Sequence, residues 1–281
     1  MKSVVITGAS TGIGWSAAKI LIERGFSVYG SVRKQEDAER LSKEFRENFI
    51  PLFFDVTDEA AVHAAAKQVR EELNGETLFG LVNNAGVASP APLIHQPIED
   101  FRKQLDINVV GQLIVTQAFA PLLGMDHSLK GSPGRIVNIS SVSGRNGSPF
   151  LGAYAASKHA LEGMSESLRR EMMLYRIDVI VVAPGPIATP IWDKAEQLDL
   201  SQYEHTELFE AGMKVRQFAI RNGRNGLPVD SVGKVIFQSL TAPHPPVRYT
   251  ITPNPFSTWA MSTLPKRLVD YVIAKNLGFR K

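Results

Sequence analysis

Apolar residues along the chain fall into short runs that alternate with longer amphipathic stretches. The short runs are aliphatic and β-branched, which is typical of buried strands. They cover residues 3–7, 27–31, 50–54, 78–82, 135–139, 178–183 and 248–252. The stretches between them place apolar residues at helical spacing, as at Val62, Ala65, Ala66 and Val69. This alternation predicts a single α/β domain built on a doubly wound, parallel, seven-stranded sheet.

Small and polar residues gather where the expected strands end. In a doubly wound sheet, ligands bind at the carboxyl ends of the strands, near the point where the strand order reverses. In chain order, these residues are Gly8 to Gly14, Arg33, Asp55, Asn83 to Gly86, Ser141, and Pro184 to Thr189. The sequence therefore predicts one binding site along this edge of the sheet.

Three glycines follow the first expected strand, Gly8, Gly12 and Gly14. They allow a tight turn and bring the amides that begin the next helix close to a phosphate, where the helix dipole also favours negative charge. Many tight turns between a strand and a helix bind nothing. The position of this one, at the first strand of an alternating chain, favours a site for a dinucleotide pyrophosphate.

The choice of dinucleotide depends on the end of the second strand, where residues 30–33 read Gly-Ser-Val-Arg. An acid there would bind a free ribose hydroxyl pair. With a guanidinium in its place, NADP(H) is favoured and NAD(H) is possible, with Ser31 adding a hydrogen bond; alternatively, Arg33 is an ordinary surface charge. Asp55 is expected either to bind the adenine amino group or to form a turn before a helix at Glu59.

Tyr154 and Lys158 are separated by one helical turn in the sequence Tyr-Ala-Ala-Ser-Lys. A tyrosine ordinarily loses its proton near pH 10, and a neighbouring ammonium favours the phenolate. The pair thus predicts a proton donor and acceptor for hydride transfer between a nicotinamide and a carbon that bears oxygen. Considered alone, the pentapeptide is also an ordinary start of an amphipathic helix.

Two further positions are candidates for the same chemistry. Ser141 would hold and polarise the substrate oxygen, and its neighbours Ser140 and Ser143 compete for that role. Asn108 lies inside a long helical pattern, where asparagine is a poor helix former. It is expected either to bind a water on a proton path from Lys158 or to be a solvated helix residue.

These motifs, in this order, resemble the short-chain dehydrogenase/reductase family over residues 2–189. The resemblance implies a Rossmann-type fold and a catalytic tetrad of Asn108, Ser141, Tyr154 and Lys158, with Ser141 selected by its spacing of thirteen residues from Tyr154. It also implies that Thr189 contacts the nicotinamide carboxamide. The expected cofactor contacts are Gly8, Ser10, Thr11, Gly12, Ile13, Gly14, Ser31, Arg33, Asp55, Val56, Asn84, Ala85, Gly86, Tyr154, Lys158, Pro184, Gly185, Ile187 and Thr189.

Within the family, the Tyr-x-x-x-Lys spacing argues against the enoyl reductases, and the glycine spacing argues against the sugar-nucleotide epimerases. Residues 28–33 and the long tail look most like the retinol and hydroxysteroid dehydrogenases. The resemblance therefore implies a hydrophobic alcohol or carbonyl substrate and a homodimer or homotetramer. Residues 190–227 carry no motif and are expected to form a substrate lid, or else a helical hairpin that covers the sheet edge.

Composition narrows the classes that remain. The 281 residues include no cysteine, which excludes disulfides and thiolate metal sites and suits a reducing compartment. No two of the six histidines share a helical spacing, so no metal site is expected. The chain enters its first strand almost at once, and no apolar run approaches the length of a membrane span, about 20 residues. We therefore expect a cytoplasmic protein.

The tail at residues 256–281 is apolar and basic. From Met261 onward it has a net charge of +4, against +3 for the whole chain. It is expected to cover the pocket or to join an interface in preference to lying on an anionic membrane. The sequence shows no basic patch with interspersed stacking aromatics, so nucleic acid is not an expected partner. The rival classes are an NADP(H)-sensing regulatory protein without turnover and a structural interaction protein; the former would be expected to lack Tyr154 or Lys158.

Overall fold

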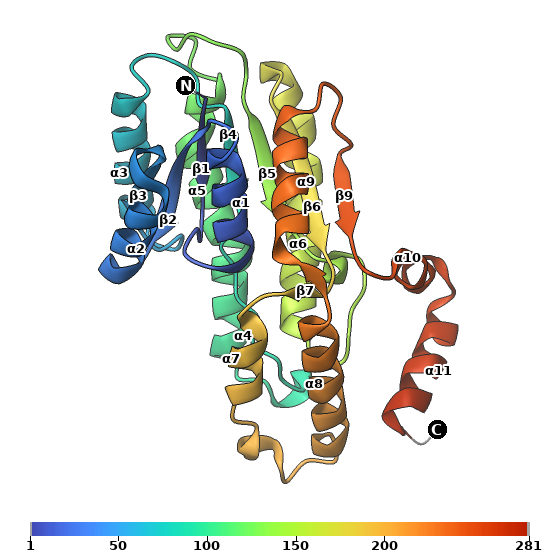
Figure 1. The fold of residues 1–281 in the computed structure, drawn as a ribbon. Helices are drawn as coiled ribbons and strands as arrows, with labels where there is room; N and C mark the ends of the chain where they lie inside the picture. Colours follow the sequence, from blue (N-terminus) through green and yellow to red (C-terminus); the bar gives the residue numbers. More distant parts are fainter. Residues whose placement is uncertain (1, 280–281) are drawn as a thin grey trace.

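Seven parallel strands form the central sheet of the computed structural model, which describes residues 2–279 (Figure 1). The strand order is β3-β2-β1-β4-β5-β6-β9, so the order reverses between β1 and β4. The strands are β1 (Ser3–Ile6), β2 (Ser27–Val32), β3 (Phe49–Phe53), β4 (Gly80–Asn83), β5 (Arg135–Ile139), β6 (Asp178–Pro184) and β9 (Arg248–Ile251). The predicted fold is confirmed, and the strand boundaries agree with the predicted ones to within two residues.

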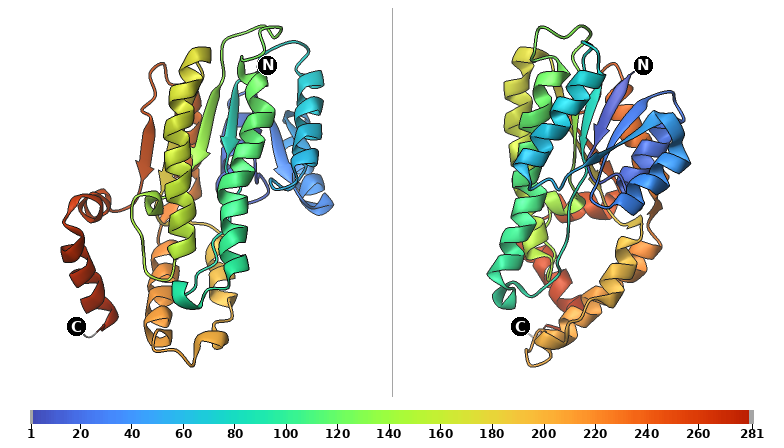
Figure 2. Two further views of the ribbon diagram at one scale, coloured as in Figure 1. Left: turned by 180° about the vertical axis from the view of Figure 1, so that it is seen from behind. Right: turned by 90° about the vertical axis from the view of Figure 1, so that its left-hand side faces the viewer.

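Helices cover both faces of this sheet (Figure 2). One layer contains α1 (Gly12–Ile22), α2 (Gln35–Phe45) and α9 (Val229–Thr241), and the other contains α3 (Glu59–Glu72), α4 (Ile98–Leu105), α5 (Gly111–Phe119) and α6 (Gly152–Met172). Val4 and Ile6 pack into the first layer and Val5 into the second, because successive side chains of a strand point to opposite faces.

The amphipathic helices bury the residues that their spacing predicts. In α3, Val62, Ala65, Ala66 and Val69 are all buried. The helix begins where the Asp58 side chain accepts a hydrogen bond from the Ala61 amide at 3.0 Å, satisfying one of the free amides at the N-terminus. Local capping and one apolar face thus fix both the start and the orientation of α3.

A continuous helical run extends over Ile98–Leu123 and includes a π-helical turn at Asp106–Val110. By length and composition it is the one segment among residues 2–279 that could cross a membrane, so the expectation that no segment reaches that length is wrong. Half of its most apolar window is buried inside the domain, and its middle packs against α3. This is the environment of a core helix.

Residues 190–227 fold as a helical hairpin of α7 (Ile191–Gln197) and α8 (Phe209–Arg224). Its ends are joined by two short strands absent from the predicted set, β7 (Ile187–Ala188) and β8 (Leu227–Pro228). Beyond β9, the tail forms α10 (Pro255–Thr263) and α11 (Lys266–Leu277); of the tail's basic residues, Arg280 and Lys281 lie outside the described residues. Short helical turns occupy Arg46–Asn48, Leu93–His95, Ala120–Leu123, Val142–Gly144, Met173–Tyr175 and Ser201–Tyr203.

Candidate active site

The glycine turn after β1 has the geometry of a phosphate cradle. Gly8 and Gly12 have φ values of +66° and +59°, which side chains rarely adopt. A Cβ on Gly14 would lie 2.2 Å from the Gly8 carbonyl oxygen, so only glycine fits at that position. At the N-terminus of α1, the capping residue Thr11 makes no side-chain hydrogen bond to the helix amides. The turn therefore fits a pyrophosphate, as the sequence predicts.

Hydrogen bonds join this turn to β4. Thr7 Oγ1 accepts from the amides of Asn84 and Ala85, both at 2.9 Å, and the Asn84 amide group donates to the Thr7 and Gly8 carbonyls. Asn83 donates to Asn138 Oδ1 at 2.9 Å and so ties β4 to β5. The edge where the strand order reverses is thus rigidly cross-linked.

At the end of β2, Ser31 and Arg33 have different surroundings. Ser31 is buried beneath the glycine turn, and its hydroxyl oxygen accepts from the Gly8 amide at 2.8 Å. The Arg33 side chain is 72% exposed and pairs with the Asp55 carboxylate at 3.2 Å. Partial burial acts to raise the pKa of Asp55, but hydrogen bonds from Thr57 and Arg33 outweigh it and lower that pKa. Asp55 thus accepts hydrogen bonds from Thr57 in the turn before α3. Arg33, although paired with Asp55, keeps most of its side chain in solvent.

The four residues of the expected tetrad lie around the ends of β4 and β5. Lys158 Nζ donates to the Ile139 carbonyl at 2.8 Å and lies 5.8 Å from the centre of the Tyr154 ring. The buried Asn108 side chain bonds both the amide and the carbonyl of Val87, each at 2.8 Å. Asn108 lies in the π-helical turn, so the helix is deformed where asparagine was expected to carry a cost.

The geometry distinguishes the three candidate serines. Ser141 is the serine that acts on Tyr154, since its side chain acts to lower the pKa of the tyrosine. Ser140 Oγ instead donates to Glu162 at 3.0 Å, while the Ser143 amide donates to Ser141 Oγ at 3.1 Å. Ser141 is therefore the one of these three serines whose side chain acts on Tyr154.

The acidities of the two titrating groups differ from expectation. Burial raises the pKa of Tyr154, and the neighbouring Ser141 side chain only partly opposes that rise. The expectation that Lys158 makes Tyr154 more acidic is therefore wrong for the chain alone, because desolvation of the phenolate dominates. Burial also lowers the pKa of Lys158 to about 8, so this ammonium releases its proton more readily than an exposed lysine.

The remaining expected cofactor contacts lie on the same edge. The Thr189 methyl group is 3.7 Å from the position of a Cβ on Gly12, so β7 approaches the glycine turn. Gly185 donates to the Ile251 carbonyl at 2.7 Å directly after Pro184 ends β6, and Ile187 is buried in β7. The Ser10 carbonyl accepts from Arg40 at 2.6 Å, and buried Val56 packs where a side chain on Gly111 would stand. Thr11 and Gly86 are exposed, whereas Ile13 is partly buried.

Three contributors are absent from the predicted set. Thr7 supplies the hydroxyl that joins β1 to β4, and Ser157 Oγ links Asn108 to the Tyr154 carbonyl, donating at 2.7 Å. Glu162 accepts from Ser140 and forms a largely buried ion pair with Arg248 at 2.8 Å. Thr7 ends the first predicted strand and Ser157 lies in the quoted pentapeptide, so polar residues at these expected buried positions were an available signal. No signal in the sequence indicated that Glu162 pairs with Arg248.

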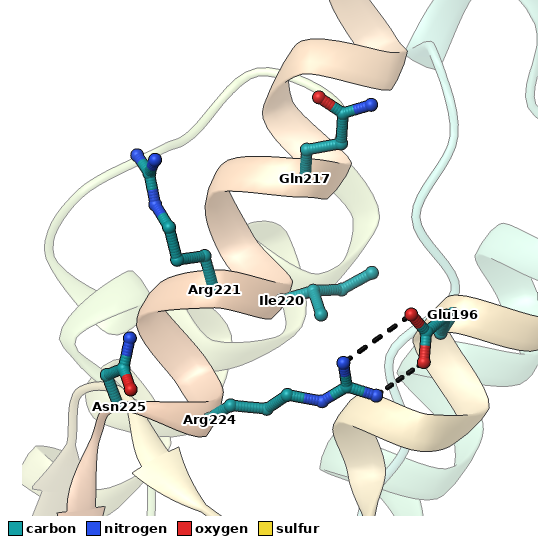
Figure 3. Close-up of a pocket in the computed structure, with 6 residues that line it drawn as sticks. All are labelled: Glu196, Gln217, Ile220, Arg221, Arg224 and Asn225. Carbon is teal, nitrogen blue, oxygen red and sulfur yellow. Dashed lines mark hydrogen bonds and ion pairs between the residues drawn. The ribbon is translucent and has the colours of Figure 1, made fainter.

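A cavity of about 390 Å³ lies in the helical hairpin (Figure 3). Its residues are Glu196, Gln217, Ile220, Arg221, Arg224 and Asn225. Arg224 crosses from α8 to pair with Glu196 and Asp193 of α7, as Figure 3 shows for Glu196. No tetrad residue lines this cavity, so it reflects how the two helices are pinned together and not the site of chemistry.

Among the described residues, no three His, Cys, Asp or Glu side chains cluster in a way that could hold a metal ion. Two of the histidines do meet, because the rings of His95 and His205 lie 6.2 Å apart. This contact brings the Leu93–His95 turn up to the segment between α7 and α8.

With this geometry established, comparison with known proteins defines the class. The chain belongs to the short-chain dehydrogenase family of oxidoreductases, whose model matches residues 2–199. It is 36% identical to an NADPH-dependent 3-dehydrocapnine reductase of Ornithobacterium rhinotracheale, over 99% of this chain and 98% of that protein. It is 34% identical to human retinol dehydrogenase 5, over 96% and 87%. These relatives confirm the resemblance found in the sequence.

Solved structures agree on the fold. A short-chain dehydrogenase/reductase from Burkholderia phymatum, crystallised in complex with NAD, superposes with a TM-score of 0.78 over 96% of this chain and 95% of that one. The two sequences are 23% identical. The likeness therefore supports the fold of the chain.

Proposed function

We propose that the protein is an NADPH-preferring reductase that interconverts a ketone or aldehyde and its alcohol, with Tyr154 as the acid and base. The observation that carries this proposal is the position of Lys158, whose Nζ is held by the Ile139 carbonyl at the end of β5 and lies 5.8 Å from the centre of the Tyr154 ring, on the same sheet edge as the glycine turn. A protein that only senses the cofactor has no use for a tyrosine and a lysine placed in this way.

In this proposal, each residue of the tetrad has its own role in the reaction. When bound, the cofactor supplies or accepts a hydride. Reduction also places a proton on the carbonyl oxygen, and Tyr154 gives that proton while Ser141 donates a hydrogen bond to the same oxygen. Lys158, whose pKa burial lowers to about 8, is poised to return a proton towards Tyr154. Asn108 holds the backbone at Val87 and, through Ser157, the turn that carries Tyr154.

The preference for NADPH is supported by the end of β2. No Asp or Glu occurs in residues 30–33, and the exposed Arg33 can turn from Asp55 to a phosphate. A relative that covers almost the whole chain is named as NADPH-dependent. The glycine turn, Ser31 and Asn84 would hold the rest of the dinucleotide, with Thr189 beside the nicotinamide.

A hydrophobic substrate is supported by the apolar side chains that adjoin Tyr154. Leu93 packs where a side chain on Gly152 would stand, two residues before Tyr154, and Phe150 packs against Gly212 of α8. The hairpin and the Leu93–His95 turn thus approach the same end of α6, which supports the role of residues 190–227 as a substrate lid. The named substrate of one relative, retinol, is consistent with this class.

The proposal also includes an oligomeric state and a cellular compartment. We infer a cytoplasmic homodimer or homotetramer, which suits a chain without cysteine that exposes Val110 and Leu113 in the π-helical turn of Asn108 and the α5 helix that follows it. Sedimentation equilibrium of the purified protein measures the number of subunits.

The experiment that tests the proposed function follows NADPH oxidation against ketones and aldehydes graded from small and polar to large and apolar. We expect kcat/KM to rise with the apolar surface of the substrate and NADPH to be preferred over NADH. Binding of NADPH without turnover in either direction on the whole panel would instead support a sensor, and absence of NADPH binding would support a structural protein.

A further inference from the structure

The tail helices α10 and α11 contain no buried residue, unlike α1, α3, α5, α6 and α9. The exposed fraction is 77% for Phe256 and 59% for Trp259, whose rings lie 5.9 Å apart. In α11, the exposed residues Leu268 and Val272 share one face, because they are four residues apart, and exposed Leu264 lies just before the helix. An apolar surface of this extent marks an interaction site.

A second apolar stripe on α11 packs towards the body of the protein. Val269, Ile273 and Leu277 also recur every four residues, and all three are partly buried. The end of this helix reaches α8, where a Cβ on Gly278 would lie 3.5 Å from Lys214 Nζ. The helix is therefore already seated on the protein through one stripe, and the exposed stripe is left for another surface.

The charge of the tail indicates which kind of surface would contact the exposed stripe. The same segment carries Lys266, Arg267 and Lys275 against one acid, Asp270. A two-fold contact between copies of the chain would bring these cations towards one another, whereas an anionic lipid surface attracts them. Tryptophan and phenylalanine next to lysine and arginine on short helices are the composition of a helix that lies in a membrane interface.

The position of the tail relative to the active site is also informative. Both helices lie at the end of the molecule where the strands of the sheet terminate, beside the hairpin (Figures 1 and 2). The Asn146 side chain hydrogen-bonds Ser262 of α10 at 2.8 Å, and Asn146 follows the turn that begins at Ser141. A surface that held the tail would therefore face the end of the protein that carries Tyr154.

We propose that α10 and α11 form a docking surface for anionic lipid bilayers, with Phe256, Trp259, Leu268 and Val272 in the apolar layer and Lys266, Arg267 and Lys275 at the head groups. The protein would bind the bilayer peripherally and reversibly. This proposal stands apart from the proposed reaction, because it depends on the tail and on no residue of the tetrad.

The test is co-sedimentation of the full chain with vesicles of phosphatidylcholine, with and without an equal share of phosphatidylglycerol. We expect binding to the anionic vesicles, at least tenfold weaker binding to phosphatidylcholine alone, and release in 0.5 M salt. Phe256→Ser/Trp259→Ser and Lys266→Glu/Arg267→Glu should each weaken binding at least tenfold.

Matched controls are available in the chain. Leu174→Ser/Val247→Ser removes two side chains that are 79% and 57% exposed, close to the values for Phe256 and Trp259, but they precede β6 and β9 at the opposite end of the sheet. Lys43→Glu/Lys67→Glu reverses two charges on α2 and α3. Neither control should change vesicle binding, and NADPH binding by every variant shows that it is folded.

Tryptophan fluorescence reports the contact itself. Vesicles should shift the emission of the wild type to shorter wavelength, and this shift should be absent from Trp259→Phe. Equal binding to both kinds of vesicle, no binding to either, or an equal loss in the control variants would overturn the proposal. So would a concentration-dependent dimer that produces the same shift without lipid, since the tail would then be an interface between copies.

Discussion

Two regions of the molecule differ in the kind of side chain that they bury and expose. One is the proposed catalytic edge, where the tetrad and the glycine turn lie at the carboxyl ends of the strands; the other is the C-terminal tail with α10 and α11. At the catalytic edge, buried polar groups such as Asn108, Asn83 and Lys158 each have hydrogen-bond partners within about 3 Å. In the tail, large apolar residues such as Phe256 and Trp259 are exposed. The first region is costly to disturb from within, because a buried polar group that loses its partner is destabilising.

This difference indicates where function resides in each region. The rigid edge fixes the position of a few atoms and therefore suits chemistry. The tail contributes little to the core, and its surface suits contact with something outside the chain. Variants in the two regions should differ accordingly in stability, pH dependence and binding.

The largest effect on stability is expected from Glu162→Gln, because it leaves Arg248 largely buried without its counter-charge. Breaking a buried ion pair costs about 3–5 kcal/mol. The matched variant Glu166→Gln lies one turn further along α6 and breaks an exposed pair with Arg170, which is worth about 0–1 kcal/mol. Urea unfolding of both variants measures the difference, and equal losses would contradict it.

The pH dependence of stability should reveal the buried Lys158. Its pKa is about 8 in the folded protein and near 10.4 when unfolded, so the unfolded state binds more protons between these values. Stability from this group therefore rises with pH across that window, by up to about 3 kcal/mol. The Lys158→Met variant should lack this rise in the free energy of unfolding, because methionine does not titrate. Unfolding curves of the two proteins that stay parallel from pH 7.5 to 10.5 would disprove it.

At the cofactor end, Arg33→Ala should raise the KM for NADPH by about 10- to 100-fold, since one charge-assisted hydrogen bond is worth about 1.5–3 kcal/mol. The KM for NADH, which lacks the phosphate, should stay nearly unchanged and serves as the internal control. Steady-state kinetics with both cofactors decide the matter. If both KM values rose together, Arg33 would be supporting the turn at Asp55 and not selecting the cofactor.

The smallest effect is expected in the tail. Phe256→Ser should change the free energy of unfolding by no more than about 0.5 kcal/mol, because a residue this exposed contributes little packing. By contrast, Leu161→Ala in the buried face of α6 should cost about 2–5 kcal/mol. Thermal or urea unfolding tests both. A large loss in Phe256→Ser would show that the tail helps to hold the fold.

Much of the catalytic edge could be predicted because its signals are local. Strand periodicity identifies all seven strands of the sheet, and glycine at positions of positive φ or close approach identifies the turn. The predicted positions of Gly8, Asn84 and Tyr154 follow from the rule that parallel strands bring their carboxyl ends together. For these residues, sequence order was enough to predict a shared site.

Other features could not be predicted because they depend on packing between distant segments. Glu162 and Arg248 are 86 residues apart and belong to no motif. The pairing of β7 with β8 involves two residues from each strand, too few for a periodic pattern. The raised pKa of Tyr154 depends on how closely other segments enclose it, so the spacing from Lys158 gave the wrong direction for the chain alone.

The central claim is that Tyr154 moves the proton that accompanies hydride transfer. The most direct test compares wild type with Tyr154→Phe, measuring NADPH affinity from its fluorescence and single-turnover reduction of the best carbonyl substrate. We expect unchanged NADPH affinity and a rate about 10²- to 10⁴-fold lower. A Tyr154→Phe protein that binds NADPH normally and reduces the substrate at the wild-type rate would contradict the account.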